Sequence, residues 1–248
     1  MRSQPLVVVL AFVALIATNA SSQTNSPLIV TGNPRSVAEQ LKQHGVELTN
    51  EGLLKALKNV DGEVRYLAAE KLAEDKVEEA IPSIAEALNV EKMPVTRINI
   101  ALALAQLGED KGIVVLKKSC NNQDLPGYLR ARATTYLLDL KRDDCLNATL
   151  DMLQSAGDPD TQIQALSLLP RFQNASKQQS QKILDAIVKN LADPAPAVRI
   201  NASIVLARIG DPLGIPYLQT ALASEREEVV RLQMEADLKR LQGTANSR

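Results

Sequence analysis

An internal repeat with a period of 32 to 35 residues runs through most of this 248-residue chain. The clearest copy is DPAPAVRINASIVLARIGDPLGIPYLQTAL at residues 193–222, and Arg199 is the reference position for aligning the others. The equivalent positions in successive copies are Arg65, Arg97, Arg130, Gln164, Arg199 and Arg231. A nearly fixed period of this length favours stacked supersecondary units, each of which contacts only its neighbours.

Each copy has the pattern of two helices joined by a short turn. Apolar residues in the clearest copy recur at the spacing of one helical stripe, at Val198, Ala202, Val205, Leu206 and Ile209. Asp211 and Pro212 then supply a capping acceptor and a residue with fixed φ, which are typical of a new helix start. Because isolated helices shorter than about 12 residues are marginal, the helices must gain stability from stacking.

Six such hairpins are expected between residues 50 and 241. The first helices are predicted at 50–58, 78–89, 110–119, 143–155, 177–191 and 212–223. The second helices are predicted at 62–73, 94–107, 127–140, 160–172, 195–208 and 226–241. A further helix at 36–44 is expected to cap the open end of the stack. Pro170 lies inside one predicted second helix and should kink or end it, because proline removes a backbone hydrogen bond.

An acidic residue stands six positions before the reference residue in five of the six copies. The six residues at this offset are Asn59, Glu91, Asp124, Asp158, Asp193 and Glu225. Together with the period, the paired helices and the Gly-Asp-Pro turn at 210–212, this pattern resembles HEAT repeats over residues 45–241, and most of all the short HEAT-like repeats of the phycobilin-lyase type. The resemblance implies an all-α fold, a right-handed α-α superhelix (a HEAT-like solenoid) of about six helical-hairpin repeats.

The resemblance also implies a structural role for the acidic and basic residues at these positions. In that family they are buried or half-buried in rows that join adjacent repeats. The residues that would form such a structural ladder here are Glu91, Arg97, Asp124, Arg130, Asp193, Arg199, Glu225 and Arg231. The fourth copy departs from the pattern, since Gln164 stands in the position of the arginine.

The first residues have the pattern of a targeting segment. Met1 and Arg2 give a positive start, and the 12 residues 6–17 form an unbroken apolar run, shorter than the roughly 20 needed to span a bilayer. We therefore predict a signal peptide at 1–20, cleaved near Ala20, with a retained signal anchor as the alternative. Residues 21–34 are expected to form a flexible tether, 35–241 the solenoid and 242–248 a disordered tail. The mature protein is expected to be periplasmic or secreted, without membrane insertion.

Composition argues against several kinds of activity. The net charge of -1, the 2% of aromatic residues and the lack of tryptophan disfavour binding to nucleic acid. His44 is the one histidine, and a surface or helix-capping role is expected, with no metal site or cofactor. HEAT-repeat deoxyhypusine hydroxylases hold iron with repeated His-Glu pairs, which this chain lacks. We find no phosphate-binding loop, nucleophile elbow or zinc-protease motif, and predict that the protein is not an enzyme.

Two cysteines and three glycosylation-type triplets need separate consideration. Export would permit a disulfide, but Cys120 ends one predicted first helix and Cys145 begins the next. In a parallel stack these helix ends lie on opposite edges, so we expect two buried or partly buried thiols, with a disulfide as the alternative. The triplets at Asn147, Asn174 and Asn201 matter only in a host that glycosylates.

The inner surface made by the second helices is the expected binding surface. Positions two, six and nine after the reference lie on a common side and include Asn99, Gln106, Arg132, Tyr136, Asp139, Asn201, Arg208 and Arg240. Tyrosine and arginine are enriched in binding hot spots, although an ordinary solvated face explains the same residues. The leading hypothesis is a non-catalytic scaffold that binds an unidentified protein or peptide. The alternatives are an enzyme or enzyme subunit related to phycobilin lyases and, less favoured by charge, a HEAT-like DNA glycosylase.

Overall fold

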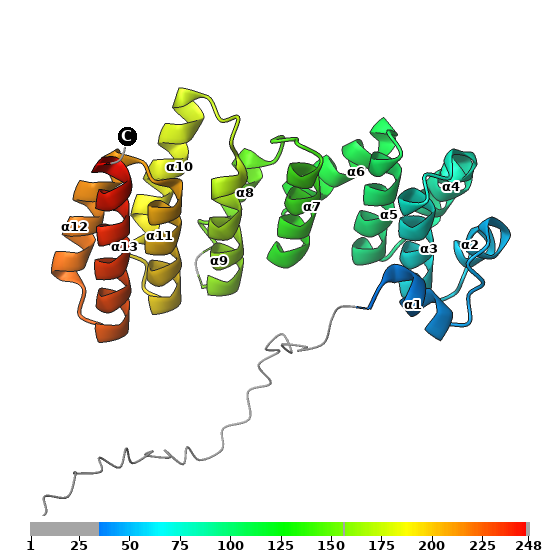
Figure 1. Ribbon diagram of the computed structural model, residues 1–248, viewed down its shortest axis with the longest axis horizontal. Helices are drawn as coiled ribbons and strands as arrows, with labels where there is room; N and C mark the ends of the chain where they lie inside the picture. The colour runs from blue at the N-terminus through cyan, green and yellow to red at the C-terminus, as the bar shows by residue number, and fades with distance from the viewer. Residues whose placement is uncertain (1–34, 156, 247–248) are drawn as a thin grey trace, which may run out of the picture. The chain divides into compact units, whose positions relative to one another are not determined.

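The computed structural model describes residues 35–155 and 157–246, and all regular elements within these ranges are helices (Figure 1). The first helices are α2 (Asn50–Ala56), η1 (Glu78–Ala80) with α4 (Ile81–Val90), α6 (Asp110–Asn121), α8 (Leu146–Met152), α10 (Lys177–Asn190), and η3 (Pro212–Gly214) with α12 (Ile215–Ser224). The second helices are α3 (Gly62–Glu74), α5 (Pro94–Gln106), α7 (Gly127–Asp139), α9 (Pro159–Leu168) with η2 (Leu169–Arg171), α11 (Pro196–Ile209) and α13 (Glu228–Asn246). The predicted all-α hairpin repeats are confirmed.

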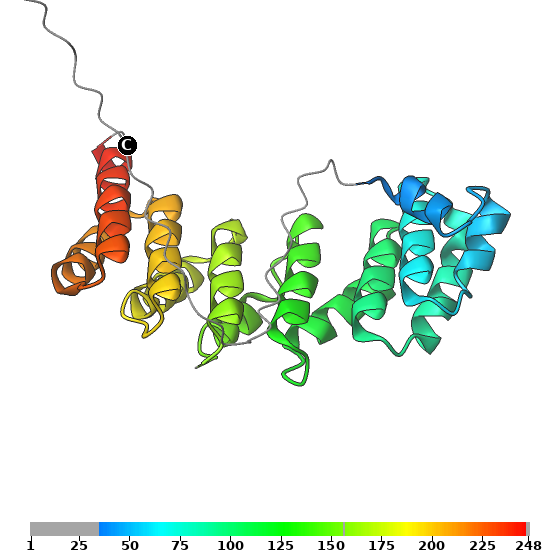
Figure 2. The ribbon, with the colours of Figure 1, turned by 90° about the horizontal axis from the view of Figure 1, so that it is seen from below.

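Helices pack in two ways that together make an α solenoid. Each first helix packs against the second helix of its own hairpin, and each second helix packs against the next second helix along the chain. The second helices therefore stand side by side in one row, with the first helices in a row behind them (Figure 2). We call the side of the second helices that faces away from the first helices the inner face.

Small buried residues allow this close packing. Ala68 and Ala69 of α3, Ala133 of α7 and Ala202 of α11 are all fully buried. The buried residues form two contiguous cores, one within residues 41–148 and the other within residues 131–241. The two cores meet at the third and fourth repeats, so the described part of the chain has a continuous apolar interior.

The fourth repeat has a different reference residue from the one expected. Five second helices begin three residues before their reference arginine, and α9 begins three residues before Gln162 rather than Gln164. The burial of Ala165 and Leu166 also matches that of Ala202 and Ser203 when Gln162 is aligned with Arg199. Gln164 is therefore the wrong reference position. The equal spacing assumed from sequence fails because 37 residues separate Gln162 from Arg199, a span that includes the 14-residue α10.

The turn after four of the second helices uses a residue in the left-handed conformation. In four repeats the residue eleven positions after the reference has positive φ, namely Lys76 (55°), Gly108 (88°), Lys141 (62°) and Gly210 (70°). Asp211 then caps the following turn by accepting a hydrogen bond from the Leu213 N–H. These turns reverse the chain so that the next first helix packs behind the row of second helices.

The ends of the described region differ in part from expectation. Ser36 caps α1 (Val37–Gln43) in a capping box with Glu39, and exposed His44 ends that helix. The predicted break at Pro170 is present, since α9 ends at Leu168. Residues 242–246, expected to begin a disordered tail, are instead helical, because α13 continues to Asn246. The predicted signal peptide and tether at residues 1–34 lie outside the described residues, among which no helix is long and apolar enough to span a membrane.

Cys120 and Cys145 form a disulfide, so the expectation of two separate thiols is wrong. Their Cα atoms lie 6.2 Å apart, within the usual range for a disulfide. The prediction failed because the fourth first helix is shorter than expected, and the segment before it runs along the end of α6. Asp144 there forms an ion pair of 2.7 Å with Lys117 of α6. Both cysteines are buried.

Candidate functional site

A pocket of about 450 Å³ opens on the inner face across three adjacent repeats. Its polar lining residues come from α3 (Tyr66 and Glu70), from α5 (Asn99 and Gln106) and from α7 (Arg132, Thr135 and Tyr136). Leu102 and Ala103 of α5 provide the apolar part of the lining. Side chains from three helices can meet here because second helices stand side by side and the residues point away from the first helices.

One hydrogen bond within the pocket joins two repeats. The Tyr136 hydroxyl donates to Asn99 Oδ1 at 2.8 Å, which leaves the amide group of Asn99 available as a donor. Burial raises the pKa of Tyr136, while the nearby Arg132 guanidinium acts in the opposite direction. Burial also raises the pKa of Tyr66, with a smaller contribution from Glu63 and Glu70. Both tyrosines therefore stay neutral hydrogen-bonding groups at ordinary pH.

Glu70 and Arg132 are two charged groups of the pocket that have no charged partner. The Glu70 carboxylate forms no hydrogen bond or ion pair with any residue that the structure describes, and burial, followed by the charge of Glu74, raises its pKa. The Arg132 guanidinium likewise forms no such contact within the described ranges. A half-buried charge without a partner is unfavourable. The pocket thus offers one acceptor and one donor group for a ligand.

Four of the residues expected on the binding surface meet in this pocket, namely Asn99, Gln106, Arg132 and Tyr136. The other four lie elsewhere, and Arg240 among them is exposed on α13. Asp139 forms an ion pair of 2.5 Å with Arg171 of the next repeat. The Asn201 side chain donates to the Ala197 carbonyl of its own helix, and Arg208 lines a separate cavity near the end of α11.

Tyr66 and Glu70 belong to the pocket but were absent from the sequence-based set. They stand one and five positions after their reference Arg65, whereas position two of that repeat is the buried Leu67. The sequence signal that could have identified Tyr66 is its rarity, because the chain has only 4 tyrosines and two of them face this pocket. Glu70 carries no such signal.

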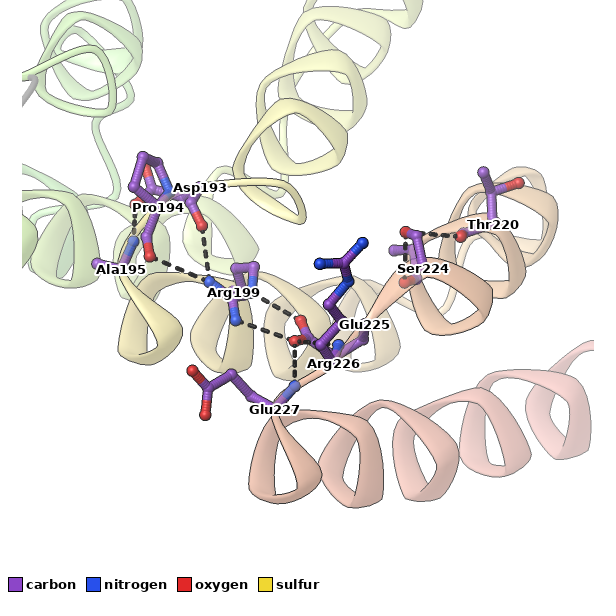
Figure 3. A network of polar contacts seen from close by, with 10 residues as sticks. Asp193, Pro194, Ala195, Arg199, Thr220, Ser224, Glu225, Arg226 and Glu227 are labelled. Atoms are coloured by element: carbon purple, nitrogen blue, oxygen red, sulfur yellow. Dashed lines mark hydrogen bonds and ion pairs between the residues drawn. The ribbon is translucent and has the colours of Figure 1, made fainter.

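The expected structural ladder is formed most completely at the first and fifth repeats. Arg199 of α11 donates through Nε and Nη2 to Glu225 of the next repeat at 2.7 and 3.0 Å, and through Nη1 to the carbonyls of Asp193 and Pro194 (Figure 3). Arg65 contacts Glu91 in the same way, with distances of 2.7 Å from Nε and 2.6 Å from Nη2. An arginine of one repeat therefore binds the acid of the following repeat.

Hydrogen bonds hold the acids of these pairs in the charged form. Hydrogen bonds from Arg199 lower the pKa of Glu225, and the Glu227 N–H adds to this effect. Burial would raise the pKa of Glu91, but hydrogen bonds from the Met93 N–H and from Arg65 hold it below its ordinary value. These carboxylates are thus fully engaged in the fold.

The middle and last repeats use other contacts. Arg97 donates to the carbonyls of Leu88 and Glu91, and the buried Arg130 donates to the carbonyls of Cys120 and Ala148, so neither of these arginines contacts an acid. In the fourth repeat Gln162 donates to Asp193 at 2.9 Å and takes the place of the arginine.

Asp124 and Arg231 also depart from the expected ladder. Asp124 forms no ion pair within the described ranges, because the Arg97 guanidinium that should reach it is turned toward its own repeat. Arg231 pairs with Glu235 one turn along the same helix at 2.6 Å, since no seventh hairpin follows among the described residues to supply an acid.

Comparisons with known proteins agree with this architecture. A family model of HEAT repeats matches residues 50–138 and 146–239, which include most of the six hairpins. No curated protein matches the chain.

Several solved structures are similar to this chain at low sequence identity. A designed armadillo repeat protein has 19% identity and a TM-score of 0.47, covering 78% of this chain and 100% of that one. Human deoxyhypusine hydroxylase in complex with glycerol has 18% identity and a TM-score of 0.43, with coverage of 85% and 82%. The CpcE and CpcF complex of phycocyanin lyase from Nostoc has 21% identity and a TM-score of 0.34, with coverage of 81% and 95%. With a family model matching well over half of its residues, the chain belongs to the HEAT-repeat family.

Proposed function

We propose that this protein is an exported, non-catalytic scaffold that binds a protein or peptide segment on its inner face. The observation that carries the proposal is the pocket in which Tyr66 of the first repeat meets Arg132 and Tyr136 of the third repeat. Tyrosine and arginine are the residues that most often dominate binding energy, since they combine large contact area with directed hydrogen bonds. A partner that fills the pocket contacts three repeats at once.

The unpaired groups of the pocket suit a polar peptide segment. Arg132 can donate to a carbonyl or carboxylate of the partner, and Glu70 can accept from an amide or a cationic side chain. Asn99, whose carbonyl oxygen already binds Tyr136, retains amide hydrogens for a main-chain carbonyl. Extended repeat surfaces suit such binding because successive repeats offer equivalent positions along the partner.

Two observations support export. The apolar run at residues 6–17 has the length and flanks of a signal peptide. The disulfide between Cys120 and Cys145 is of the kind that persists in the periplasm and outside the cell, whereas cytosolic thiols are kept reduced.

Affinity capture from the exported fraction tests the proposal. The bait is the mature protein, compared with a variant that carries Arg132→Glu and Tyr136→Ala together. A matched control carries Arg226→Glu and Tyr217→Ala, which change an exposed arginine and an exposed tyrosine outside the pocket. Circular dichroism melting establishes that both variants are folded.

The expected result is a partner that the wild type and the control retain and that the pocket variant loses by at least about tenfold, as for removal of a hot-spot residue. Equal recovery by the pocket variant and the control would show that the pocket is not the binding site. A bait that recovers no specific partner from the exported fraction would also count against the proposal.

A further inference from the structure

The corrected reference residue of the fourth repeat reveals a row of side chains whose charge changes sign along the inner face. The residues nine positions after the six references are Glu74, Gln106, Asp139, Arg171, Arg208 and Arg240. The first three repeats thus carry acidic or neutral groups at this position, and the last three repeats each carry an arginine. Arg171 joins the row only when Gln162 replaces Gln164 as the reference.

The sign changes between α7 and α9, where Asp139 and Arg171 form their ion pair. Beyond this pair, Arg208 and Arg240 are exposed and form no hydrogen bond or ion pair with any residue in the described part of the chain. The helices α9, α11 and α13 stand side by side in the row of second helices (Figure 2). Because the three arginines occupy equivalent positions at the ends of α11 and η2 and in α13, they follow one another along this row. Two guanidinium groups in the row are therefore available to a partner.

Stabilisation of helix ends does not account for this row. An arginine in the last turn of a helix interacts favourably with the helix dipole, and Arg208 has this place in α11. Arg240, however, lies six residues before the end of α13 at Asn246, and the equivalent position holds Glu74 at the end of α3. The position holds an acid in some repeats and an arginine in others, so the helix dipole alone does not explain the exposed Arg240.

A cavity of about 690 Å³ adjoins two of these arginines. Arg171 and Arg208 lie on its lining, together with Asp211 and with apolar side chains that include Leu169 and Phe172. Residues of η2, of α10 and of the end of α11 meet around this cavity. An acidic group bound by the arginines would have space beside it for an apolar neighbour.

We propose that Arg208 and Arg240, the two unpaired arginines of the row, bind an extended peptide segment with an acidic side chain at every third residue. This inference rests on the proposed function, and it names the chemistry of the partner and the end of the solenoid at which its acidic part lies. Packed helices are about 10 Å apart, and a chain in the extended polyproline II conformation advances about 3.1 Å per residue with every third side chain on the same side. Three residues of the peptide therefore span the distance from one arginine to the next.

A peptide fits these arginines better than a nucleic acid does. A single strand of nucleic acid carries a phosphate at every nucleotide, so binding it favours a dense basic surface, whereas this chain has a net charge of -1 and one arginine per repeat in the row. Arginine binds a carboxylate through two parallel hydrogen bonds, which rewards correct spacing as well as charge.

Fluorescence anisotropy with labelled glycine and serine peptides tests the inference. The first peptide carries glutamate at every third residue, the second carries three consecutive glutamates, and the third carries lysine at every third residue. The protein is used as the wild type, as the variant Arg208→Glu with Arg240→Glu, and as Arg226→Glu, which reverses an exposed charge outside the row. An oligothymidylate of equal charge serves as a further probe.

The spaced glutamate peptide should bind wild type most tightly and weaken as salt is added. The double variant should lose about tenfold or more in affinity, while Arg226→Glu should stay within about twofold. Undetectable binding of the spaced peptide at low salt would overturn the inference. So would equal binding of the clustered glutamate peptide, of the lysine peptide or of the oligothymidylate, or no loss in the double variant.

The same variants separate this inference from the proposed function. A natural partner that is lost by the Arg132→Glu and Tyr136→Ala variant but retained by Arg208→Glu with Arg240→Glu would leave inner-face binding in place and overturn the acidic-segment assignment. We expect the natural partner to be lost by the pocket variant and by the Arg208→Glu with Arg240→Glu variant alike.

Discussion

Arg199 shows how a single side chain joins two repeats. Its guanidinium contacts two carbonyls at the start of its own hairpin and both carboxylate oxygens of Glu225 in the next hairpin. The side chains of Arg199 and Glu225 are only 14% and 5% exposed, so the pair is shielded from water and from salt. Removing either partner leaves the other without its charge partner in a poorly hydrated place.

Replacing Arg199 by alanine should therefore destabilise the protein clearly. We expect a loss of about 2 kcal/mol in the free energy of unfolding, between the values typical of surface and of fully buried pairs. Arg231→Ala is the matched control, because Arg231 forms a single, more exposed ion pair within one helix and should cost about 0.5 kcal/mol. Urea denaturation measures both. Equal losses in the free energy of unfolding for the two variants would show that the contacts of Arg199 with the next repeat add nothing to stability.

The lowered pKa of Glu225 predicts a dependence of stability on pH. Hydrogen bonds from Arg199 hold the pKa of Glu225 below that of an unfolded glutamate, so the ionised carboxylate stabilises the folded state at neutral pH. This stabilisation should be lost as the pH falls through the ordinary glutamate range and then through the lowered pKa. Wild type should thus lose more stability than Glu225→Gln when the pH is lowered from about 7 to about 3, measured as the change in Tm. If Tm fell equally with pH in wild type and in Glu225→Gln, the ionised Glu225 carboxylate would not stabilise the folded state.

The turn that follows the second helix keeps the same left-handed backbone conformation in four repeats, although its residue is lysine in two of them and glycine in the other two. Lys76 and Lys141 adopt the left-handed conformation that Gly108 and Gly210 adopt in other repeats. A side chain costs about 1 kcal/mol in this conformation, because its Cβ approaches the backbone too closely. The fold accepts this cost at the two lysine positions.

Lys141→Gly should stabilise the protein by up to about 1 kcal/mol, reduced by the greater freedom that glycine gives the unfolded chain. The reverse change, Gly108→Ala, should destabilise by a similar amount, because a Cβ at Gly108 meets no atom within 4 Å and only backbone strain is added. Thermal denaturation of both variants measures the effect. If neither substitution changed the thermal stability, the turn would not impose the left-handed conformation.

Most helices could be located from sequence because each has local start and stop signals. The starts of α5, α9 and α11 each coincide with a proline, and Gly210 ends α11 in the left-handed conformation. The fourth repeat was misaligned because neither Gln162 nor Gln164 carries the charge that marks the other reference positions. The start of α9, the packing of Ala165 and Leu166, and the hydrogen bond from Gln162 to Asp193 distinguish the two.

The pocket and the disulfide were harder to predict. Asn99, Arg132 and Tyr136 share a helical face by spacing alone, so their side was predictable. Which of the residues on that side meet in one pocket depends on how neighbouring helices pack, and Glu70 has no signal of its own. The contact between Cys120 and Cys145 depends on the path of the chain into the short α8, which repeat periodicity does not encode.

At the scale of the whole molecule, the disulfide lies where the two apolar cores meet. Cys120 and Cys145 both belong to the first core, and Cys145 directly precedes Leu146 of the second. A solenoid is held together by contacts between neighbours, so its stability depends on each junction. The disulfide reinforces a junction whose first helix, α8, has only 7 residues.

Reduction of the disulfide should lower the free energy of unfolding by about 3 kcal/mol, on the chain-entropy estimate for its sequence separation of 25 residues. Urea denaturation with and without a thiol reductant measures the change. The variant with Cys120→Ser and Cys145→Ser should resemble the reduced wild type and should not respond to reductant. A wild type that is equally stable in both conditions would contradict a stabilising role.

Site-specific photo-crosslinking tests the central claim, that the inner face is the binding surface. A photoreactive amino acid placed at Thr135, on the lining of the pocket, is compared with one placed at Tyr217, an exposed position on the first helix α12. Both proteins are incubated with the exported fraction and irradiated. The account predicts a crosslinked partner at Thr135 and none at Tyr217. A partner crosslinked at Tyr217 and absent at Thr135 would contradict it.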